Sequence, residues 1–243
     1  MPSSRATTIP IVTHLIKQLQ PESILDVGVG FGKWGHLFRE YTDILASESD
    51  PARYKRENWK VRIDGIEGFP QYLTPMHEFL YDRIHVGDMC ELIRSLGEYD
   101  VIYLGDVIEH IEKDAGRRFL EDCQSRARKA VIISTPKFET GQEDLCDNEL
   151  EKHRSLWSES DFEAFAGGLA AVADGGTIVA VLAKEGCRDL VCASEWYGDR
   201  QFNANHRPMP PFKRWCRWGL VRLIGWRRFQ EWESKRQATR ASR

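Results

Sequence analysis

The sequence predicts an α/β fold built on a mainly parallel sheet with helices on its faces. Short apolar runs alternate with segments of helical periodicity over residues 9–166, which is typical of parallel strands joined by helical crossovers. Two further apolar runs, 169–173 and 177–183, flank Asp174-Gly175-Gly176, a favourable turn for an antiparallel hairpin. We therefore expect a seven-stranded, mostly parallel sheet whose last strand is antiparallel.

The expected elements before this hairpin follow in order along the chain. The strands are predicted at 23–27, 61–66, 83–86, 100–105 and 130–135. The helices are predicted at 9–20, 33–42, 70–81, 89–96, 112–127 and 159–166. Residues 43–60 are long and polar for a link between a helix and a strand, so we expect a lid or a substrate loop there. Residues 188–194 are also strand-like and offer an alternative to the hairpin.

Length and composition indicate a folded domain with an appendage. The chain has 243 residues, of which 42% are hydrophobic and 11% aromatic, and this argues against a disordered protein. We expect one domain over 1–184 and an extension over 185–243. No signal-peptide pattern and no long apolar run is present. The six cysteines are scattered without a C-x-x-C pair, which is typical of reduced thiols in a cytoplasmic protein.

The charge is distributed unevenly along the chain. Residues 201–243 contain eleven lysines and arginines and two glutamates, a net charge of +9, which leaves −12 for residues 1–200. The segment 210–236 also spaces tryptophans and aliphatic residues as in an amphipathic helix. Such a helix can pack on the domain, lie on an anionic membrane surface, or hold nucleic acid through arginines and aromatic rings. All three alternatives remain open at this point.

A glycine-rich loop follows the first strand. Residues 24–35 read ILDVGVGFGKWG, with Asp26 at the strand end and glycines at Gly28, Gly30 and Gly32. Glycines there allow a tight turn and a close approach of the backbone to a ligand. The dinucleotide-binding pattern G-x-G-x-x-G can be found here only out of register with the strand end.

The pattern D-x-G-x-G-x-G resembles motif I of the class I S-adenosylmethionine-dependent methyltransferases, and the resemblance covers roughly residues 20–183. It implies a Rossmann-like sheet with S-adenosylmethionine as the cofactor, held in part by Asp26 and the three glycines. It also implies that Glu67, at the end of the second strand, holds both ribose hydroxyls. Asp88, followed by Met89, would meet the adenine amine after the third strand. The alternative is a tight β–α connection, with Glu67 and Asp88 as ordinary caps.

The segment GDVIEH, residues 105–110, places three polar side chains directly after the fourth strand. Their spacing of i, i+3 and i+4 would put Asp106, Glu109 and His110 on one face of a helical turn. Asp106 could cap the next helix while Glu109 completes a capping box. The same residues could instead form a proton-transfer site or part of a metal site.

The later sequence adds a second histidine. After STPKF at 134–138 comes ELEKHRSLWSESDFEAF, which contains His153 and Trp157. This order resembles the metal-dependent small-RNA terminal 2′-O-methyltransferases, whereas ubiquinone-biosynthesis O-methyltransferases resemble only the first three positions. The resemblance implies a divalent ion bound by Asp106, Glu109, His110 and His153, with Asp106 standing where the RNA enzymes have Glu. Two carboxylates and two imidazoles suit Mn²⁺, Fe²⁺, Co²⁺ or Zn²⁺, while Mg²⁺ usually prefers oxygen ligands.

We therefore expect an S-adenosylmethionine-dependent methyltransferase whose catalytic residues are His110, Asp106 and His153. The expected acceptor is a hydroxyl of a sugar, polyol, glycan or other small molecule. One alternative is 2′-O-methylation of an RNA end, which the acidic residues 1–200 disfavour. Another is a catalytically idle methyltransferase-like module that docks through its tail. The expected location is cytoplasmic, with peripheral membrane contact if the tail binds an anionic surface.

Overall fold

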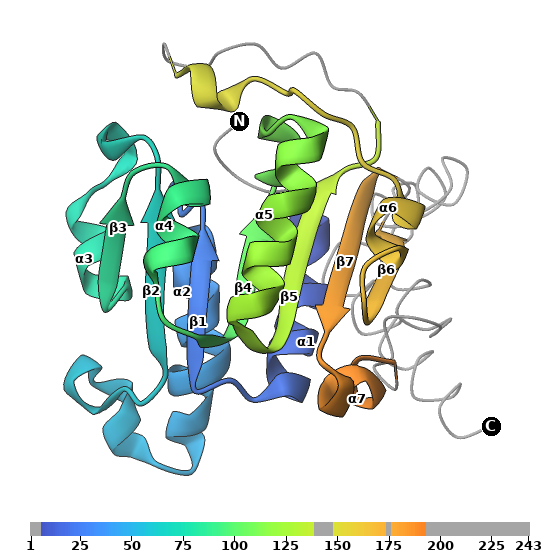
Figure 1. The fold of residues 1–243 in the computed structure, drawn as a ribbon. Helices are drawn as coiled ribbons and strands as arrows, with labels where there is room; N and C mark the ends of the chain where they lie inside the picture. Colours follow the sequence, from blue (N-terminus) through green and yellow to red (C-terminus); the bar gives the residue numbers. More distant parts are fainter. Residues whose placement is uncertain (1–5, 139–147, 174–175, 193–243) are drawn as a thin grey trace, which may run out of the picture. The chain divides into compact units, whose positions relative to one another are not determined.

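The computed structural model describes residues 6–138, 148–173 and 176–192, and these form a seven-stranded sheet with helices on both faces (Figure 1). The strand order is β3-β2-β1-β4-β5-β7-β6. The strands are β1 (Ser23–Val27), β2 (Arg62–Glu67), β3 (Arg83–Val86), β4 (Tyr99–Gly105), β5 (Ala127–Pro136), β6 (Gly168–Ala173) and β7 (Thr177–Ala183). Only β7 runs antiparallel to its two neighbours. The predicted mostly parallel sheet with an antiparallel last strand is confirmed.

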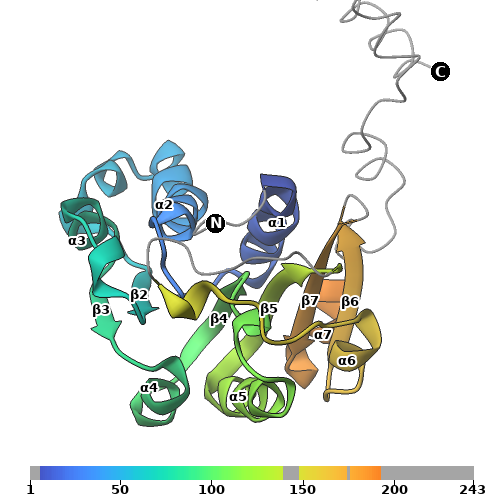
Figure 2. The ribbon, with the colours of Figure 1, turned by 90° about the horizontal axis from the view of Figure 1, so that it is seen from above.

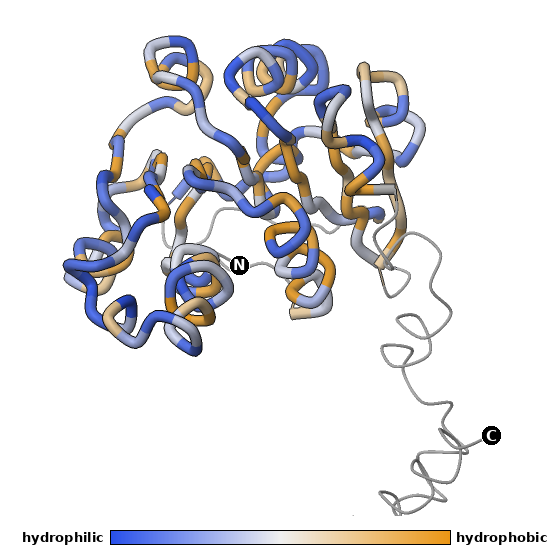
Figure 3. Tube along the Cα trace, turned by 90° about the horizontal axis from the view of Figure 1, so that it is seen from below, coloured by the Kyte–Doolittle hydropathy of each residue, from blue (hydrophilic) through white to orange (hydrophobic). Residues whose placement is uncertain are grey.

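The helices form a layer on each side of the sheet (Figure 2). One layer contains α1 (Ile9–Leu19), α2 (Lys33–Arg39), α3 (Pro75–Leu80) and α7 (Arg188–Cys192). The other contains α4 (Met89–Ser95), α5 (Lys113–Arg126) and α6 (Glu159–Glu163). Alternate side chains of each central strand enter opposite layers, as in β4, where Tyr103 and Leu104 belong to different core clusters. Figure 3 shows the resulting concentration of hydrophobic residues in the strands.

The predicted helix 70–81 is interrupted in the structure. A short 3₁₀ turn covers Pro70–Tyr72, and α3 begins at Pro75. A proline disfavours helical geometry in the residue before it, and Thr74 is accordingly extended, with φ −135° and ψ 166°. Thr74 then caps α3 through a capping box with His77. The alternative of a strand at 188–194 is wrong for the described part of that segment, because 188–192 form α7.

The expectation that residues 43–60 form a lid or substrate loop is wrong. This segment precedes β2, so it lies at the amino ends of the parallel strands, the edge opposite to the glycine loop (Figure 1). It folds into short helical turns tied down by ion pairs. Asp43 is fully buried and pairs with Arg39 at 3.0 Å and with Arg53.

The predicted extension is described only in its first residues. Val191 of α7 is fully buried in the core layer that contains α1, so the chain continues to pack on the sheet domain beyond residue 184. The boundary at 184 stays a prediction. The basic helix and its membrane or nucleic-acid partner fall within 193–243, outside the described residues. Among the helices that the structure describes, none has the length and apolar character needed to span a membrane.

Candidate active site

The glycine loop joins β1 to α2 at the carboxyl edge of the sheet. The backbone N–H groups of Gly28 and Val29 both donate to Ile66 O, at 2.8 and 3.1 Å. Gly28 has φ +75°, and a Cβ atom there would lie 2.6 Å from Val107 Cγ2. Both the left-handed backbone and the close approach therefore require glycine. Gly28 and Gly30 line a pocket above β1, β2 and β4, where open α/β sheets bind ligands.

Asp26 supports this loop from below and does not line the pocket. It is 1% exposed and accepts a 2.6 Å hydrogen bond from the Tyr81 hydroxyl, which itself accepts from Gly35 N at 3.1 Å. Burial raises the pKa of Asp26 to about 7, although the Tyr81 hydrogen bond opposes the shift. Gly32, at the start of α2 with φ +84°, also lies outside the pocket lining. Both residues shape the loop rather than face the cavity.

Glu67 ties the glycine loop to the end of β2. It is 6% exposed, and its two carboxylate oxygens accept from Gly30 N at 2.9 Å and from Phe69 N at 2.8 Å. Each oxygen has a second lone pair, so the carboxylate can still accept two neighbouring hydroxyl groups of a ligand. Its position in the pocket lining fits the role that the sequence resemblance implies.

Asp88 and Met89 line the pocket beyond β3. Asp88 caps α4, because its Oδ1 accepts from Cys90 N at 2.7 Å and from Glu91 N at 3.2 Å. Its Oδ2 makes no hydrogen bond within the described residues. The capping role and a ligand contact are therefore compatible, with one oxygen for each.

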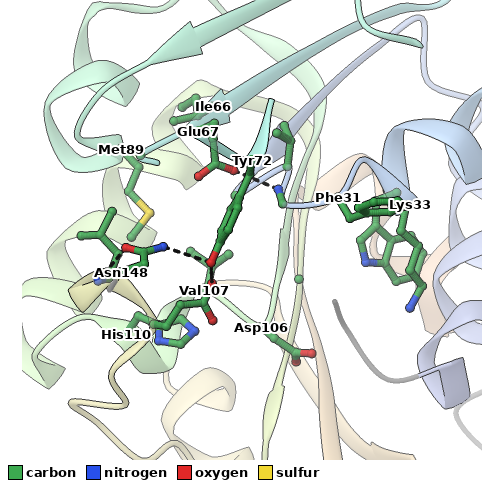
Figure 4. A pocket seen from close by; sticks show the side chains of 18 of the residues that line it. Phe31, Lys33, Ile66, Glu67, Tyr72, Met89, Asp106, Val107, His110 and Asn148 are labelled. Atoms are coloured by element: carbon green, nitrogen blue, oxygen red, sulfur yellow. Dashed lines mark hydrogen bonds between the residues drawn. The ribbon is translucent and has the colours of Figure 1, made fainter. Parts of the chain in front are cut away.

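The pocket also contains residues that the sequence analysis did not single out. They include Lys33, Tyr72 and Asn148 (Figure 4), together with Leu150 and Glu151. Lys33 is the one lysine or arginine among the described lining residues. Burial lowers its pKa, and the charge of Asp106 works against this shift. No pattern in the sequence points to Tyr72 as a pocket residue. Asn148, Leu150 and Glu151 could have been suspected, because they lie shortly before the predicted site residue His153.

Asp106 leaves β4 in a left-handed conformation, with φ +55°. One 3₁₀ turn follows at Ile108–His110, and α5 begins only at Lys113. Asp106 N donates to Ser134 O at 2.8 Å, and the Glu109 carboxylate accepts from Thr135 instead of reaching back to Asp106. The capping-box interpretation and the single helical turn are therefore wrong.

Glu109, His110 and His153 form a compact cluster. One possible ligand atom from each lies within 4.8 Å of the others, and Asp106 is not part of this group. Glu109 is 3% exposed, and its Oε1 has no hydrogen-bond partner within the described residues. Burial and then the charge of Asp106 hold the pKa of Glu109 well above its usual range. A buried carboxylate with an unpaired oxygen is unfavourable unless a cation or proton compensates it.

The two histidines are arranged for ligation or proton transfer. His110 Nδ1 lies 3.1 Å from Lys152 O, and since a carbonyl only accepts, Nδ1 carries the hydrogen and Nε2 keeps its lone pair. The rings of His110 and His153 lie 4.9 Å apart at 76°. Burial lowers the pKa of both imidazoles, which favours their neutral form.

The set Glu109, His110 and His153 fits a divalent ion by its donor types. Ligands about 2.1 Å from one ion are separated by at most about 4.2 Å, so small side-chain movements would close the cluster around it. Three of the four predicted ligands are thus brought together. Asp106 is near enough to raise the pKa of Glu109, but it lines the pocket on the side of Lys33.

No protein-family model matches the sequence, and no curated protein matches it. Solved structures do share its fold. The N-terminal domain of EvdMO1, crystallised in the presence of SAH and D-fucose, has 15% identity and a TM-score of 0.54 over 75% of this chain and 85% of that one. The small RNA methyltransferase HEN1 has 17% identity and a TM-score of 0.52 over 73% of this chain and 25% of that one.

A third structure is an O-methyltransferase family protein from Burkholderia thailandensis, with 10% identity and a TM-score of 0.50 over 74% of this chain and 56% of that one. The strand order with its antiparallel β7, the glycine loop after β1 and the acidic end of β2 all agree with what the sequence resemblance implies. The chain has the fold of the class I S-adenosylmethionine-dependent methyltransferases.

Proposed function

We propose that the protein is an S-adenosylmethionine-dependent methyltransferase that transfers the methyl group to a hydroxyl oxygen. One observation carries the proposal: a single pocket joins the glycine loop and Glu67 to His110 of the Glu109–His110–His153 cluster. The glycine loop and Glu67 suit binding of the cofactor, and the Glu109–His110–His153 cluster suits activation of a hydroxyl group. The SAH in the EvdMO1 structure supports the choice of cofactor.

In this proposal the cofactor extends along the carboxyl edge of the sheet. Glu67 accepts the ribose hydroxyls, and Asp88 with Met89 holds the adenine. The glycine loop allows the methionyl part to approach the backbone between Gly28 and Asp106. Asp26 and Gly32 act indirectly, since they hold the loop in shape. The acidic lining also suits a ligand that carries a positive sulfonium.

The transfer requires an oxygen nucleophile in line with the methyl group. The hydroxyl oxygen forms a bond to the methyl carbon, the carbon–sulfur bond breaks, and its electron pair stays on sulfur. The hydroxyl proton must leave, and the neutral Nε2 of His110 is placed to accept it. If Glu109, His110 and His153 hold Mn²⁺, Fe²⁺, Co²⁺, Zn²⁺ or Mg²⁺, the ion would acidify that hydroxyl instead. His110 would then serve as a ligand.

The charge of the pocket favours an uncharged acceptor. Its lining contains four carboxylates, those of Glu67, Asp88, Asp106 and Glu151, against the ammonium of Lys33. Repulsion would disfavour a phosphate beside them. We therefore propose a sugar, polyol or glycan hydroxyl as the acceptor, and the D-fucose of the EvdMO1 structure supports this choice. The similarity to HEN1 keeps an RNA 2′-hydroxyl as the second candidate.

Two measurements on the full-length protein test the proposal. Calorimetry should detect binding of S-adenosylhomocysteine that Glu67→Ala weakens strongly. Labelled methyl groups from S-adenosylmethionine should then be transferred to members of a panel of neutral sugars and polyols, with RNA oligonucleotides as the competing panel. Absence of cofactor binding would refute the proposal as a whole. Methyl transfer to RNA ends alone would reject the sugar acceptor but would still support methyl transfer to a hydroxyl oxygen.

A chelation series separates the two means of activating the hydroxyl. With a bound ion, exhaustive chelation should abolish turnover even at saturating cofactor, and added Mn²⁺ or Co²⁺ should restore it. Full activity after chelation would reject the ion and leave His110 as the general base. Full activity in His110→Ala as well would remove this cluster from the mechanism.

A further inference from the structure

Residues 148–157, here called the cover segment, cross above the carboxyl ends of the strands. They begin above β1 and β2 and end at the start of α6 (Figures 1 and 2). The segment contributes Asn148, Leu150 and Glu151 to the cofactor pocket. It also contributes His153 to the Glu109–His110–His153 cluster. One continuous stretch of backbone thus belongs to both sites.

One end of the cover segment is fixed to the turn after β4. Arg154 N and Ser155 N both donate to Glu109 O, at 2.8 and 3.0 Å. The Ser155 hydroxyl donates to Ile108 O at 3.3 Å and accepts from Trp157 Nε1 at 2.9 Å, and Trp157 is 1% exposed. These bonds hold His153 against His110.

The other end is fixed to the wall of the cofactor pocket. The Tyr72 hydroxyl donates to Glu151 Oε1 at 3.0 Å. It also accepts from Asn148 Nδ2 at 3.3 Å (Figure 4). Leu150 closes over the loop after β2, where a Cβ atom on Gly68 would lie 2.8 Å from Leu150 Cδ1. Asn148 and Glu151 are only 3% and 8% exposed, so this end of the segment forms part of the pocket wall.

Glu151 faces the same space as Glu67. Burial is the main cause of the raised pKa of Glu67, and the charge of Glu151 adds to it. Glu151 also acts on the other site, because its charge raises the pKa of His110 against the dominant effect of burial. A ligand in either site therefore lies in the electrostatic field of the same carboxylate and beside the same segment of backbone.

We propose that the cover segment couples the two sites, so that a divalent ion held by Glu109, His110 and His153 strengthens binding of the cofactor, and the cofactor strengthens binding of the ion by the same factor. An ion that fixes His153 also fixes Asn148 and Glu151 over the pocket, so the cofactor binds to a wall that is already ordered. Reciprocity follows from thermodynamic linkage. This inference rests on the proposed function, because it assumes a cofactor in the pocket.

The test is calorimetric titration of S-adenosylhomocysteine into the full-length protein, once with saturating Mn²⁺ and once with EDTA. The affinity should be at least about fivefold higher with Mn²⁺, the lower end of typical allosteric couplings. A separate titration of Mn²⁺, followed by its electron paramagnetic resonance signal, should show the same factor when S-adenosylhomocysteine is present. Neither readout depends on turnover.

Two variants assign the coupling to the cover segment. Tyr72→Phe removes the hydroxyl that joins Glu151 and Asn148 to the pocket wall, so the ratio of affinities with and without Mn²⁺ should fall towards one. Its Mn²⁺ affinity without cofactor should stay that of the wild type. Glu149→Gln is the matched control on the same segment, because Glu149 is 75% exposed and lies outside the pocket lining. The Glu149→Gln variant should keep the wild-type ratio of S-adenosylhomocysteine affinities with and without Mn²⁺.

The outcomes separate this inference from the proposed function. Failure of S-adenosylhomocysteine to bind under either condition would overturn the proposed function. Binding that Mn²⁺ leaves unchanged would overturn the coupling alone, whether the ion fails to bind or binds independently. A ratio that persists in Tyr72→Phe would show that the coupling does not pass through the contact between the cover segment and Tyr72.

Discussion

Replacing Asp26 with asparagine should change how the stability of the protein depends on pH. The carboxyl is fully enclosed beneath the glycine loop, its Oδ2 accepts from the Tyr81 hydroxyl, and its Oδ1 has no partner within the described residues. Asparagine has nearly the same shape, and its carbonyl can accept the same hydrogen bond. The substitution therefore removes the titrating charge while keeping the packing. Any constant cost of burying the amide is independent of pH.

The magnitude follows from the pKa of Asp26, which burial raises from 3.8 to about 7. The fold binds this proton more tightly than the unfolded chain, so raising the pH through this interval destabilises the fold. The destabilisation is absent below pH 3.8 and complete above about pH 7. At about 1.36 kcal/mol for each pKa unit, the full effect is about 4 kcal/mol. Between pH 5 and pH 8 the expected loss is roughly 2–3 kcal/mol.

The assay is urea unfolding of wild type and Asp26→Asn at pH 5, 6, 7 and 8, followed by tryptophan fluorescence. Trp34 and Trp157 are 5% and 1% exposed, so unfolding should change their emission. The free energy of unfolding of the variant should increase relative to that of the wild type as the pH rises, and most of this change should occur below pH 7. Because groups distant from Asp26 titrate equally in both proteins, the difference between the two curves reports mainly on Asp26. Curves that stay parallel from pH 5 to pH 8 would refute the reasoning.

The other predictions concern the loop, the cofactor and the cluster. Glu67→Gln should weaken S-adenosylhomocysteine binding roughly ten- to a hundredfold, because hydrogen bonds to a charged group contribute about 1.5–3 kcal/mol; equal affinity in calorimetry would contradict the role of Glu67. Gly28→Ala should lower the free energy of unfolding by about 1–3 kcal/mol, because the new Cβ is strained at φ +75° and clashes with Val107. Gly97→Ala meets nothing within 4 Å and should be nearly neutral; equal melting temperatures of the two variants would contradict the clash. His153→Ala should lower Mn²⁺ affinity while leaving S-adenosylhomocysteine affinity in EDTA unchanged, and undiminished Mn²⁺ binding would exclude His153 as a ligand.

The sequence by itself determined the sheet and the edge at which the site lies. Apolar runs of strand length gave β1 to β7 with small errors at their ends, since the core imposes a regular pattern on each buried strand. The glycine loop, Glu67 and Asp88 lie at or just beyond the ends of strands in the sequence, and parallel strands place their carboxyl ends at one edge. The position of these residues relative to the strand ends was therefore sufficient to predict that they lie around one pocket.

Tertiary structure alone decided which of these residues face the pocket and which act together. Asp26 and Glu67 lie on the same face of the sheet, because the register pairs Asp26 with Gly65, two residues before Glu67. Glu67 is the last residue of β2 and reaches the pocket, whereas Asp26 lies one residue inside the end of β1 and is buried against Tyr81. Asp106 has the spacing of a ligand but lies in a left-handed turn that separates it from the cluster. His110 and His153 are 43 positions apart in the sequence, and the backbone hydrogen bonds to Glu109 O bring them together. Such long-range bonds, and the burial that shifts the pKa of each group, leave no periodic pattern in a sequence because they depend on how distant segments pack.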